Sequence, residues 1–521
     1  MDGSTTGVAA LAEPGEAAAD TARQRPQGLA LAALVAAVSV AAAILQLRGP
    51  PNGDVAWLMV VGERMLDGQR LYADINELNP PMCALLYLPW VWLGRLLGVP
   101  AEPLVIAATI GLAGAALGLA WRIARVAGFR LERASFWFIG ALVLMVMPGS
   151  SFAEREHFAL IGTLPMLAAS AVRAVRGNGG KPGRWEAIAA GMGGGLAMAI
   201  KPHFALALLL PALGVAWRRR SVAPLLSTEN FVAGGIVAGF WSLSAWLFPA
   251  FFTTMLPLAE LVYAGDRLGW LLLVFGRPTW PFWGVLAVTL ILYRRQLDDP
   301  WFATLLLGAL GFFLAYLAQG KGFTYQLLPA EAVATLALLL AFATGNAASG
   351  WRGAIPGLVA VLVVALPVLA GAAPPQQRED LAALLRPYGQ GLRLLNLTPE
   401  LETASPLERM IGARLVSSGP FPWMALGAIR LERADPPPDR LPALRAIEQR
   451  ERELLLADLV RGAPDIILTG GDGFDWLGWA KADPAIAAQL AGYDVLGVVG
   501  TGSEAVTVLR RSGLQPAVQP G

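Results

Sequence analysis

The sequence is poor in the residues that build most metal centres and all disulfides. One of its 521 residues is cysteine and two are histidine. Because Cys83 is the single cysteine of the sequence, an intrachain disulfide, a zinc ribbon and a cysteine-ligated cluster are excluded. His157 and His203 are too few for a multi-histidine centre. A metal ion would therefore depend mainly on carboxylates.

Charge is also scarce. Asp, Glu, Lys and Arg make up 15% of the chain and hydrophobic residues 55%, against roughly 25% charged residues in a soluble domain. The mean hydropathy of +0.54 indicates a membrane protein. Forty basic and 38 acidic residues give a net charge of +2, a balance that leaves no electrostatic footprint for nucleic acid.

The charged residues are unevenly distributed along the chain. The first 373 residues hold 45 of them and the last 148 hold 33. We therefore expect a polytopic α-helical membrane protein, with a membrane domain over residues 29–373 and a small soluble α/β domain over residues 374–521. Within that last domain, the patterns predict a helix over 441–460 and strands over 465–469 and 505–509.

The N-terminal 28 residues show no apolar period and precede an apolar run over residues 29–47. This pattern favours a disordered cytoplasmic tail followed by a signal-anchor helix. A cleaved signal peptide is the alternative. The run approaches the ~20 residues that a bilayer crossing needs, which favours the anchor.

Eleven crossings are expected in total. The further apolar runs that predict them cover residues 103–121, 134–148, 157–172, 185–200, 202–217, 230–249, 268–293, 301–318, 327–343 and 354–372. Arginine-rich loops near 122–133, 173–184, 218–220 and 294–295 should be cytoplasmic. Counting the proline-rich run 81–98 as a span would invert these loops, so we expect it to lie in the membrane interface.

This topology places the N-terminus in the cytoplasm and the C-terminal domain in the periplasm of a bacterial inner membrane. It also gathers the unusual polar residues on the outer face. They are Asp54, Glu154, Arg155, Glu156, His157, Lys201, His203, Arg277, Lys321, Tyr325 and Gln326. Ionisable groups near hydrocarbon are costly and tend to be functional.

Structural explanations exist for single members of this set. Asp54 suits the N-cap of a short amphipathic helix over residues 54–67, with Trp57, Val60, Val61 and Met65 facing lipid. Residues 154–157 suit an interfacial salt-bridge cluster, and a lysine at a helix end can reach toward water. These explanations account less well for the joint clustering.

The layer has the chemistry for a lipid-linked substrate. A glycosyl phosphate leaves as a stable anion, so it needs cations for charge neutralisation. An acceptor hydroxyl needs a carboxylate within hydrogen-bond reach to take its proton.

These residues resemble the GT-C superfamily of polytopic glycosyltransferases, which includes protein mannosyltransferases and the lipid A aminoarabinose transferases. The resemblance is carried by Asp54 after the first membrane helix, by the segments 68–72 and 80–81, by Glu154 to His157 and by the stretch 321–329. It departs at Leu78 and Asn79, where aminoarabinose transferases often carry Glu-Lys. That departure puts a zinc or phosphate role for this segment in doubt.

The resemblance implies a hexosyl or pentosyl transferase that moves a sugar from a polyprenyl-phosphate donor to a glycan, lipid or protein acceptor, with inversion. Asp54 would be the catalytic carboxylate and Glu156 the second-loop acid. The donor phosphate would meet Lys201, Arg277 and Lys321. Asp54 and Glu156 would hold Mg²⁺ or Mn²⁺, or work without a metal.

Two other functions remain open from the sequence. A lipid-linked oligosaccharide ligase or polymerase shares polyprenyl donors, and a transporter or flippase would need polar groups at mid-membrane, of which these spans hold few. The C-terminal domain would recognise the acceptor or cover the outer face.

Overall fold

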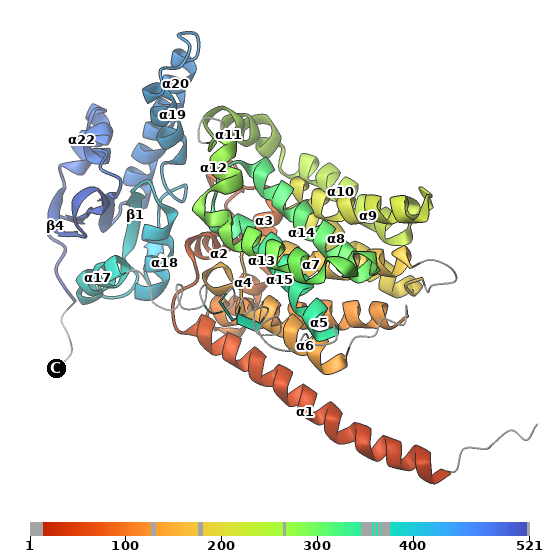
Figure 1. Cartoon of the computed structure of the whole chain (residues 1–521). Helices are drawn as coiled ribbons and strands as arrows, with labels where there is room; N and C mark the ends of the chain where they lie inside the picture. The colour runs from red at the N-terminus through yellow and green to blue at the C-terminus, as the bar shows by residue number, and fades with distance from the viewer. Residues whose placement is uncertain are drawn as a thin grey trace, which may run out of the picture.

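The computed structural model describes residues 14–126, 132–175, 181–263, 267–344, 357–358, 361–362, 365 and 376–517. A helical membrane part and a C-terminal α/β part lie against each other, the first red to green and the second cyan to blue (Figure 1). The main helices of the membrane part are α1 (Pro14–Leu47), α2 (Gly53–Leu66), α3 (Pro81–Leu85), α4 (Leu88–Leu97), α5 (Ala101–Val126), α6 (Arg133–Ala141), α7 (Arg155–Ala174), α8 (Arg184–Ile200), α9 (Ala205–Arg219), α10 (Thr228–Leu247), α11 (Leu256–Tyr263), α12 (Trp270–Phe275), α13 (Trp280–Tyr293), α14 (Pro300–Gln319) and α15 (Thr324–Thr344).

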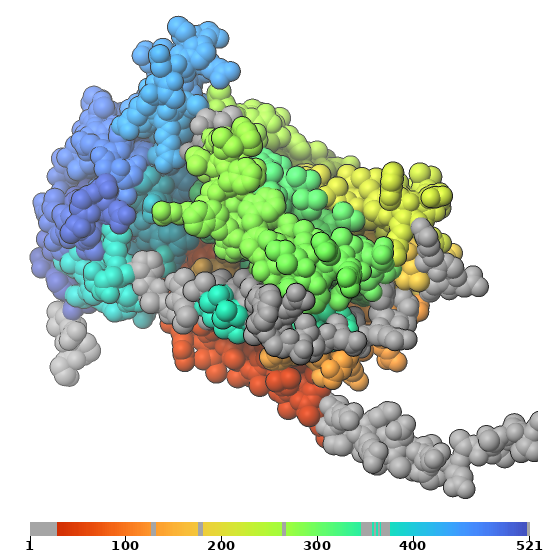
Figure 2. Space-filling model, in the orientation of Figure 1, coloured from red at the N-terminus to blue at the C-terminus, as the bar shows by residue number. Residues whose placement is uncertain are grey.

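Seven of the described helices are long and apolar enough to cross a membrane. They are Leu29–Leu47, Ala101–Val126, Arg155–Ala174, Thr228–Leu247, Trp270–Asp298, Pro300–Gln319 and Thr324–Thr344. Helix α7 is central, with 83% of its apolar window buried, whereas α1 runs along the edge with 11% buried (Figure 1). Large apolar side chains exposed on α12, such as Trp270 and Phe275, suit contact with lipid (green in Figure 2).

The expected count of eleven spans is not confirmed. The run 134–148 forms the nine-residue α6 and a π-helical turn, and the runs 185–200 and 202–217 form helices of 17 and 15 residues. A 15-residue helix is about 22 Å long, shorter than a hydrocarbon core of about 30 Å. Nearly all of the run 354–372 lies outside the described residues.

Two expectations near the N-terminus have different outcomes. The prediction of a disordered tail over residues 1–28 is wrong for residues 14–28, because α1 begins at Pro14; residues 1–13 lie outside the described residues. Four of these 15 residues are Ala, the strongest helix former, which favours a helix even without an apolar period. The run 81–98 is split into α3 and α4, of 5 and 10 residues, so neither piece can cross.

The C-terminal part is the small α/β domain that the sequence predicts. Its elements are α17 (Gln376–Leu385), β1 (Arg393–Leu397), α18 (Leu401–Ile411), β2 (Arg414–Leu415), α19 (Trp423–Arg433), α20 (Leu441–Ala457), β3 (Ile466–Gly470), α21 (Trp476–Lys481), α22 (Pro484–Leu490), β4 (Tyr493–Val499) and β5 (Val506–Arg511). The predicted helix 441–460 corresponds to α20, and the two predicted strands correspond to β3 and β5 within two residues.

The sheet has the strand order β2-β1-β3-β5-β4. Strands β2, β1 and β3 are parallel, whereas β5 and β4 are antiparallel to their neighbours. The loop after β2 meets the membrane part, where the buried Arg64 of α2 donates to the carbonyl oxygen of Ser417 at 2.7 Å. The backbone N–H of Asn76 donates to the Ser418 carbonyl at 2.8 Å. The carboxyl end of β2 therefore faces the loop that follows α2.

Candidate active site

Asp54 lies in the first turn of α2 without capping it. The N-cap is Asn52, whose Oδ1 accepts from the Val55 N–H at 2.9 Å, so the N-cap interpretation of Asp54 is wrong. Instead Asp54 Oδ2 lies 2.6 Å from Arg155 Nη2 at the start of α7. The Asp54 side chain is 18% exposed, and among the described residues no hydrogen bond is made to Oδ1. One carboxylate oxygen is therefore held and the other is available.

The apolar face of α2 is buried inside the protein. Trp57, Val60 and Val61 are at most 3% exposed, which contradicts the expectation that they face lipid. Neighbouring helices, α4 and α18 among them, cover this helix. Because α2 is buried on all sides, the backbone that carries Asp54 is held in a fixed position.

A hydrogen-bonded circuit fixes Arg155 against α2. Arg155 Nη1 donates to Asn79 Oδ1, and the Asn79 side-chain amide donates to Glu77 Oε1 at 2.7 Å. The other oxygen of Glu77 accepts from the indole N–H of Trp57, one turn after Asp54. The circuit therefore starts and ends on α2. In this chain the segment 77–79 orients the arginine that holds Asp54.

The second ion pair of the cluster joins Glu156 to Lys201. Lys201 Nζ lies 2.5 Å from Glu156 Oε1 and donates to Gln319 Oε1 at 2.9 Å. Its ammonium also lies 6.0 Å from the centroid of the Tyr325 ring. Glu156 is fully buried. Glu156 therefore serves as the counter-ion of Lys201. Of the two carboxylates, Asp54 is the more accessible to solvent.

Glu154 connects the two ion pairs to the start of α2. Its Oε1 accepts from the side-chain amide of Asn52, and its buried Oε2 has no partner among the described residues. Burial and the nearby Asp54 carboxylate raise the pKa of Glu154 well above its usual range. Burial and the neighbouring carboxylate therefore both disfavour the charged form of Glu154.

The structure brings Asp54, Glu154, Arg155, Glu156, Lys201 and Tyr325 together. Arg155 interacts electrostatically with both Asp54 and Glu156, so the two predicted carboxylates belong to one cluster. Glu154, Arg155 and Glu156 all lie at the start of α7. Because consecutive residues of a helix point in different directions, the three side chains reach different partners in the cluster.

Three other predicted residues lie at or near this cluster, and a fourth, Arg277, is not joined to it within the described part of the chain. His203 is half-buried and electrostatically coupled to Lys201 and Glu156. Lys321 lies in the turn between α14 and α15, two residues after Gln319. Gln326 is 5% exposed and follows Tyr325 on α15. Arg277 lies in an exposed turn after α12, and among the described residues no hydrogen bond or ion pair joins it to the cluster.

His157 is held by the backbone through both of its ring nitrogens. Its side chain is fully buried, Nδ1 accepts from the Ala153 N–H at 3.0 Å, and Nε2 lies 2.7 Å from the Leu144 carbonyl oxygen. Both ring nitrogens are thus used by the backbone. His157 anchors the loop that carries Glu154.

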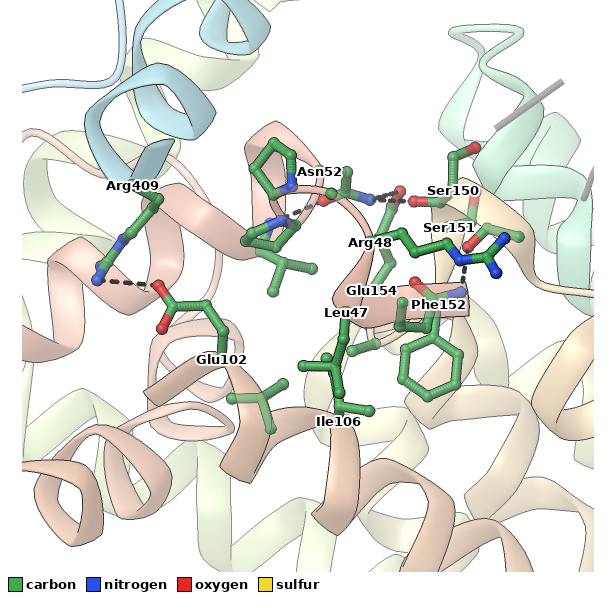
Figure 3. Close-up of a pocket in the computed structure, with 18 of the residues that line it drawn as sticks. Leu47, Arg48, Asn52, Glu102, Ile106, Ser150, Ser151, Phe152, Glu154 and Arg409 are labelled. Carbon is green, nitrogen blue, oxygen red and sulfur yellow. Dashed lines mark hydrogen bonds and ion pairs between the residues drawn. The ribbon is translucent and has the colours of Figure 1, made fainter. Parts of the chain in front are cut away.

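A cavity of about 720 Å³ adjoins the cluster between α1, α2, α5, α15 and the C-terminal domain. Its apolar wall includes Leu47, Val55, Met59, Ile106 and Phe152, and its polar wall includes Arg48, Asn52, Glu102, Glu154, Tyr325, Arg378, Glu402 and Arg409. Figure 3 shows Arg48 and Ser151 across the cavity from Glu102 and Arg409. The cavity therefore suits an amphipathic ligand with an anionic group.

Asp54 and Glu156, the two carboxylates expected to hold a metal ion, are both engaged in ion pairs. Among the residues that the structure describes, no three His, Cys, Asp or Glu side chains come close enough to hold an ion. Asp54 and Glu156 each face a cationic side chain instead, Arg155 and Lys201.

Comparison with solved structures gives the fold. ArnT from Cupriavidus metallidurans bound to undecaprenyl phosphate is similar over 94% of this chain and 99% of that chain, with 15% identity and a TM-score of 0.55. Apo ArnT from the same organism is similar over 95% and 100%, with 14% identity and a TM-score of 0.53. The chain has the GT-C fold.

Other comparisons add less. The oligosaccharyltransferase AglB from Archaeoglobus fulgidus is similar over 95% of this chain and 75% of that chain, with 11% identity and a TM-score of 0.41. Comparison with protein-family models and with curated proteins gives no match. The similarity to solved structures is therefore detected by comparing folds, whereas the sequence comparisons find no match.

Sequence reasoning missed three polar residues of this cluster. Asn52 caps α2 and contacts Glu154, Gln319 contacts Lys201, and Glu402 of the C-terminal domain contacts the backbone of Gly53. Asn52 had a detectable signal, because Asn is a preferred N-cap. Glu402 had none, since it is one of many carboxylates in a charged domain.

Proposed function

We propose that the protein is an inverting glycosyltransferase that moves a sugar from a polyprenyl-phosphate donor to an acceptor at the outer face of the inner membrane. The observation that carries this proposal is Asp54, a carboxylate with one oxygen held by Arg155 and the other available, beside an amphipathic cavity. The GT-C fold, shared with an ArnT structure that holds undecaprenyl phosphate, supports a lipid-linked donor.

In the proposed reaction the acceptor hydroxyl oxygen forms a bond to the anomeric carbon as the bond from that carbon to the phosphate oxygen breaks. The phosphate leaves with the electron pair, and the hydroxyl proton passes to Asp54. A single displacement of this kind inverts the anomeric centre. Because an ordinary Asp is a weak base, proton transfer comes late, and correct placement matters more than basicity.

The cluster supplies groups for the leaving phosphate. Lys201 uses two of its three protons on Glu156 and Gln319, so one remains for a phosphate oxygen. Arg48 lines the cavity and has no ion pair among the described residues. Charge-assisted bonds of this type stabilise the departing anion.

The amphipathic cavity supports a lipid-linked substrate. An acyl or prenyl chain would lie along Leu47, Ile106 and Phe152, and its charged head would lie near Arg48. We assign the cavity to this class of ligand, because a free sugar would leave the apolar wall exposed to water.

The test is Asp54→Asn, which keeps the shape and removes the base. In liposomes with extracted polyprenyl-phosphate sugars, we expect sugar transfer to fall by about 10²-fold or more. Binding of the lipid donor should be retained. The exposed Asp439→Asn is the matched control and should transfer normally. Unchanged transfer by Asp54→Asn would reject the assignment, and the mass of the head group used would distinguish a monophosphate sugar from a diphosphate glycan.

A further inference from the structure

The C-terminal domain reaches the backbone next to Asp54. Glu402, in the first turn of α18, accepts a hydrogen bond through Oε1 from the Gly53 N–H at 2.7 Å. Gly53 is the first residue of α2 and immediately precedes Asp54. The first N–H groups of a helix have no partner within it. A carboxylate from a distant part of the chain therefore satisfies one of them beside the reacting residue.

Glu402 is held from its other side as well. Its Oε2 accepts from Arg378 Nη2 of α17 at 2.7 Å, and the Arg378 side chain is 11% exposed. The Glu402 side chain is half-exposed in the cavity wall. Both oxygens are thus engaged, which fixes the carboxylate between α17 and α2.

Any side chain at position 53 would displace the Glu402 side chain. A Cβ there would lie 2.8 Å from Glu402 Oε1 and 3.1 Å from a side-chain carbon of Leu401. Helices α2 and α18 run in parallel, because Arg409 near the end of α18 donates to Glu63 near the end of α2 at 2.7 Å. The contact at Gly53 is therefore the first point of a continuous helix pair.

We propose that Glu402 is a positioning residue for Asp54, so that the C-terminal domain takes part in sugar transfer by fixing the first turn of α2. Arg155 holds the Asp54 carboxylate at 2.6 Å, while Glu402 holds the preceding backbone N–H. A shift of Gly53 moves Asp54 relative to Arg155 and to the substrates. Misplacement by about 1 Å is enough to slow catalysis strongly. This inference rests on the proposed function, since it needs Asp54 to be the reacting carboxylate.

The test compares three variants of the full-length chain. Glu402→Ala removes the acceptor, and we expect kcat for sugar transfer to fall about 10- to 100-fold with little change in KM for the lipid donor. Glu402→Gln keeps an oxygen at the same reach and should retain most of the activity. Glu402→Asp keeps the charge but shortens the side chain, and should behave like Glu402→Ala.

A second pair of variants approaches the contact from the other side. Gly53→Ala pushes the carboxylate away and should lower kcat to a similar extent. Combined with Glu402→Ala it should cost little more, because both changes break one contact. Glu379→Ala on α17, a carboxylate that pairs with Arg386 and is 40% exposed, is the matched control and should leave kcat unchanged.

The outcomes separate this inference from the proposed function. Loss of transfer in Asp54→Asn together with normal kcat in Glu402→Ala overturns the positioning role alone. Normal transfer in Asp54→Asn overturns the proposed function. Equal activity of Glu402→Gln and Glu402→Ala, both low, also overturns the positioning role, because it would show that the carboxylate's charge and not its hydrogen bond matters. A raised KM with unchanged kcat in Glu402→Ala would assign Glu402 to substrate binding. That result would also overturn the positioning role.

Discussion

The proposed function gives Lys201 both a structural and a chemical role. Two of its three protons go to Glu156 and Gln319, and we assign the third to the leaving phosphate. Glu156 is fully buried. Removing the lysine therefore leaves a buried carboxylate without a counter-ion, which is costly whether or not the lysine also contacts phosphate.

A double variant separates these two duties. We expect Lys201→Met to lower the free energy of unfolding by about 3–5 kcal/mol, the usual cost of breaking a buried pair. Lys201→Met with Glu156→Gln removes both charges and should regain most of that stability. Transfer should stay low in both, because the leaving phosphate loses its cation. Thermal unfolding in detergent and sugar transfer on the same preparations check this.

The exposed Lys481→Met is the matched control and should change neither stability nor transfer. Full transfer by the double variant would contradict a phosphate contact for Lys201 and leave it a purely structural residue.

At the residue scale, the charged residues of the candidate site are easier to find from the sequence than its amide side chains. Glu156 and Lys201 stand out because ionisable residues are rare in an apolar sequence. Asn79 and Gln319 do not, since an amide in a turn is ordinary. Their importance comes from contacts with Arg155 and Lys201 that link positions 76 and 118 residues apart, which only the tertiary structure brings together.

At the scale of elements, glycines set the distance between the central helices. A Cβ at Gly162 of α7 would lie 2.6 Å from the carbonyl oxygen of Gly193 on α8, and a Cβ at Gly193 would lie 2.5 Å from that of Gly162. The two backbones therefore touch. Small residues serve this purpose in membrane helix pairs, and α7 carries Glu154 to Glu156 at its start.

We expect Gly162→Ala to lower the thermal midpoint of the full chain in detergent, because α7 and α8 must move apart. Gly234→Ala on α10 is the control: nothing lies within 4 Å of a Cβ there. On helix propensity alone that change is neutral or stabilising by up to about 1 kcal/mol. Equal midpoints for the two variants would contradict a close α7–α8 contact.

The sequence predicts the long apolar helices well and the short ones poorly. Hydropathy finds α5, α14 and α15 because each exceeds 18 residues of apolar character. The runs 185–200 and 202–217, expected as two spans, form α8 and α9 of 17 and 15 residues on either side of the Lys201-Pro202 turn. Hydropathy locates such short runs, whereas hydrogen bonding and proline geometry decide where each helix ends.

At the scale of the whole molecule, the site is shared between two parts of the chain. The sequence predicts the C-terminal α/β domain, but not that its α18 packs along α2 or that its β2 loop accepts from Arg64. The high density of charged residues indicates a soluble domain, but it does not predict which face of that domain packs against the membrane part. Because Glu402 contacts Gly53, the side of the membrane that holds this domain also holds Asp54.

Sidedness is therefore testable through the C-terminal domain. The only cysteine, Cys83, is fully buried, so the unchanged chain serves as the unlabelled control. Two isosteric changes at exposed positions probe opposite sides: Ser503→Cys in the C-terminal domain and Ser221→Cys beside the arginines 218–220. In intact cells an impermeant maleimide should label the first, and should label the second only after permeabilisation, because arginine-rich loops stay in the cytoplasm. The reverse pattern would put Asp54 in the cytoplasm and remove the basis for transfer at the outer face.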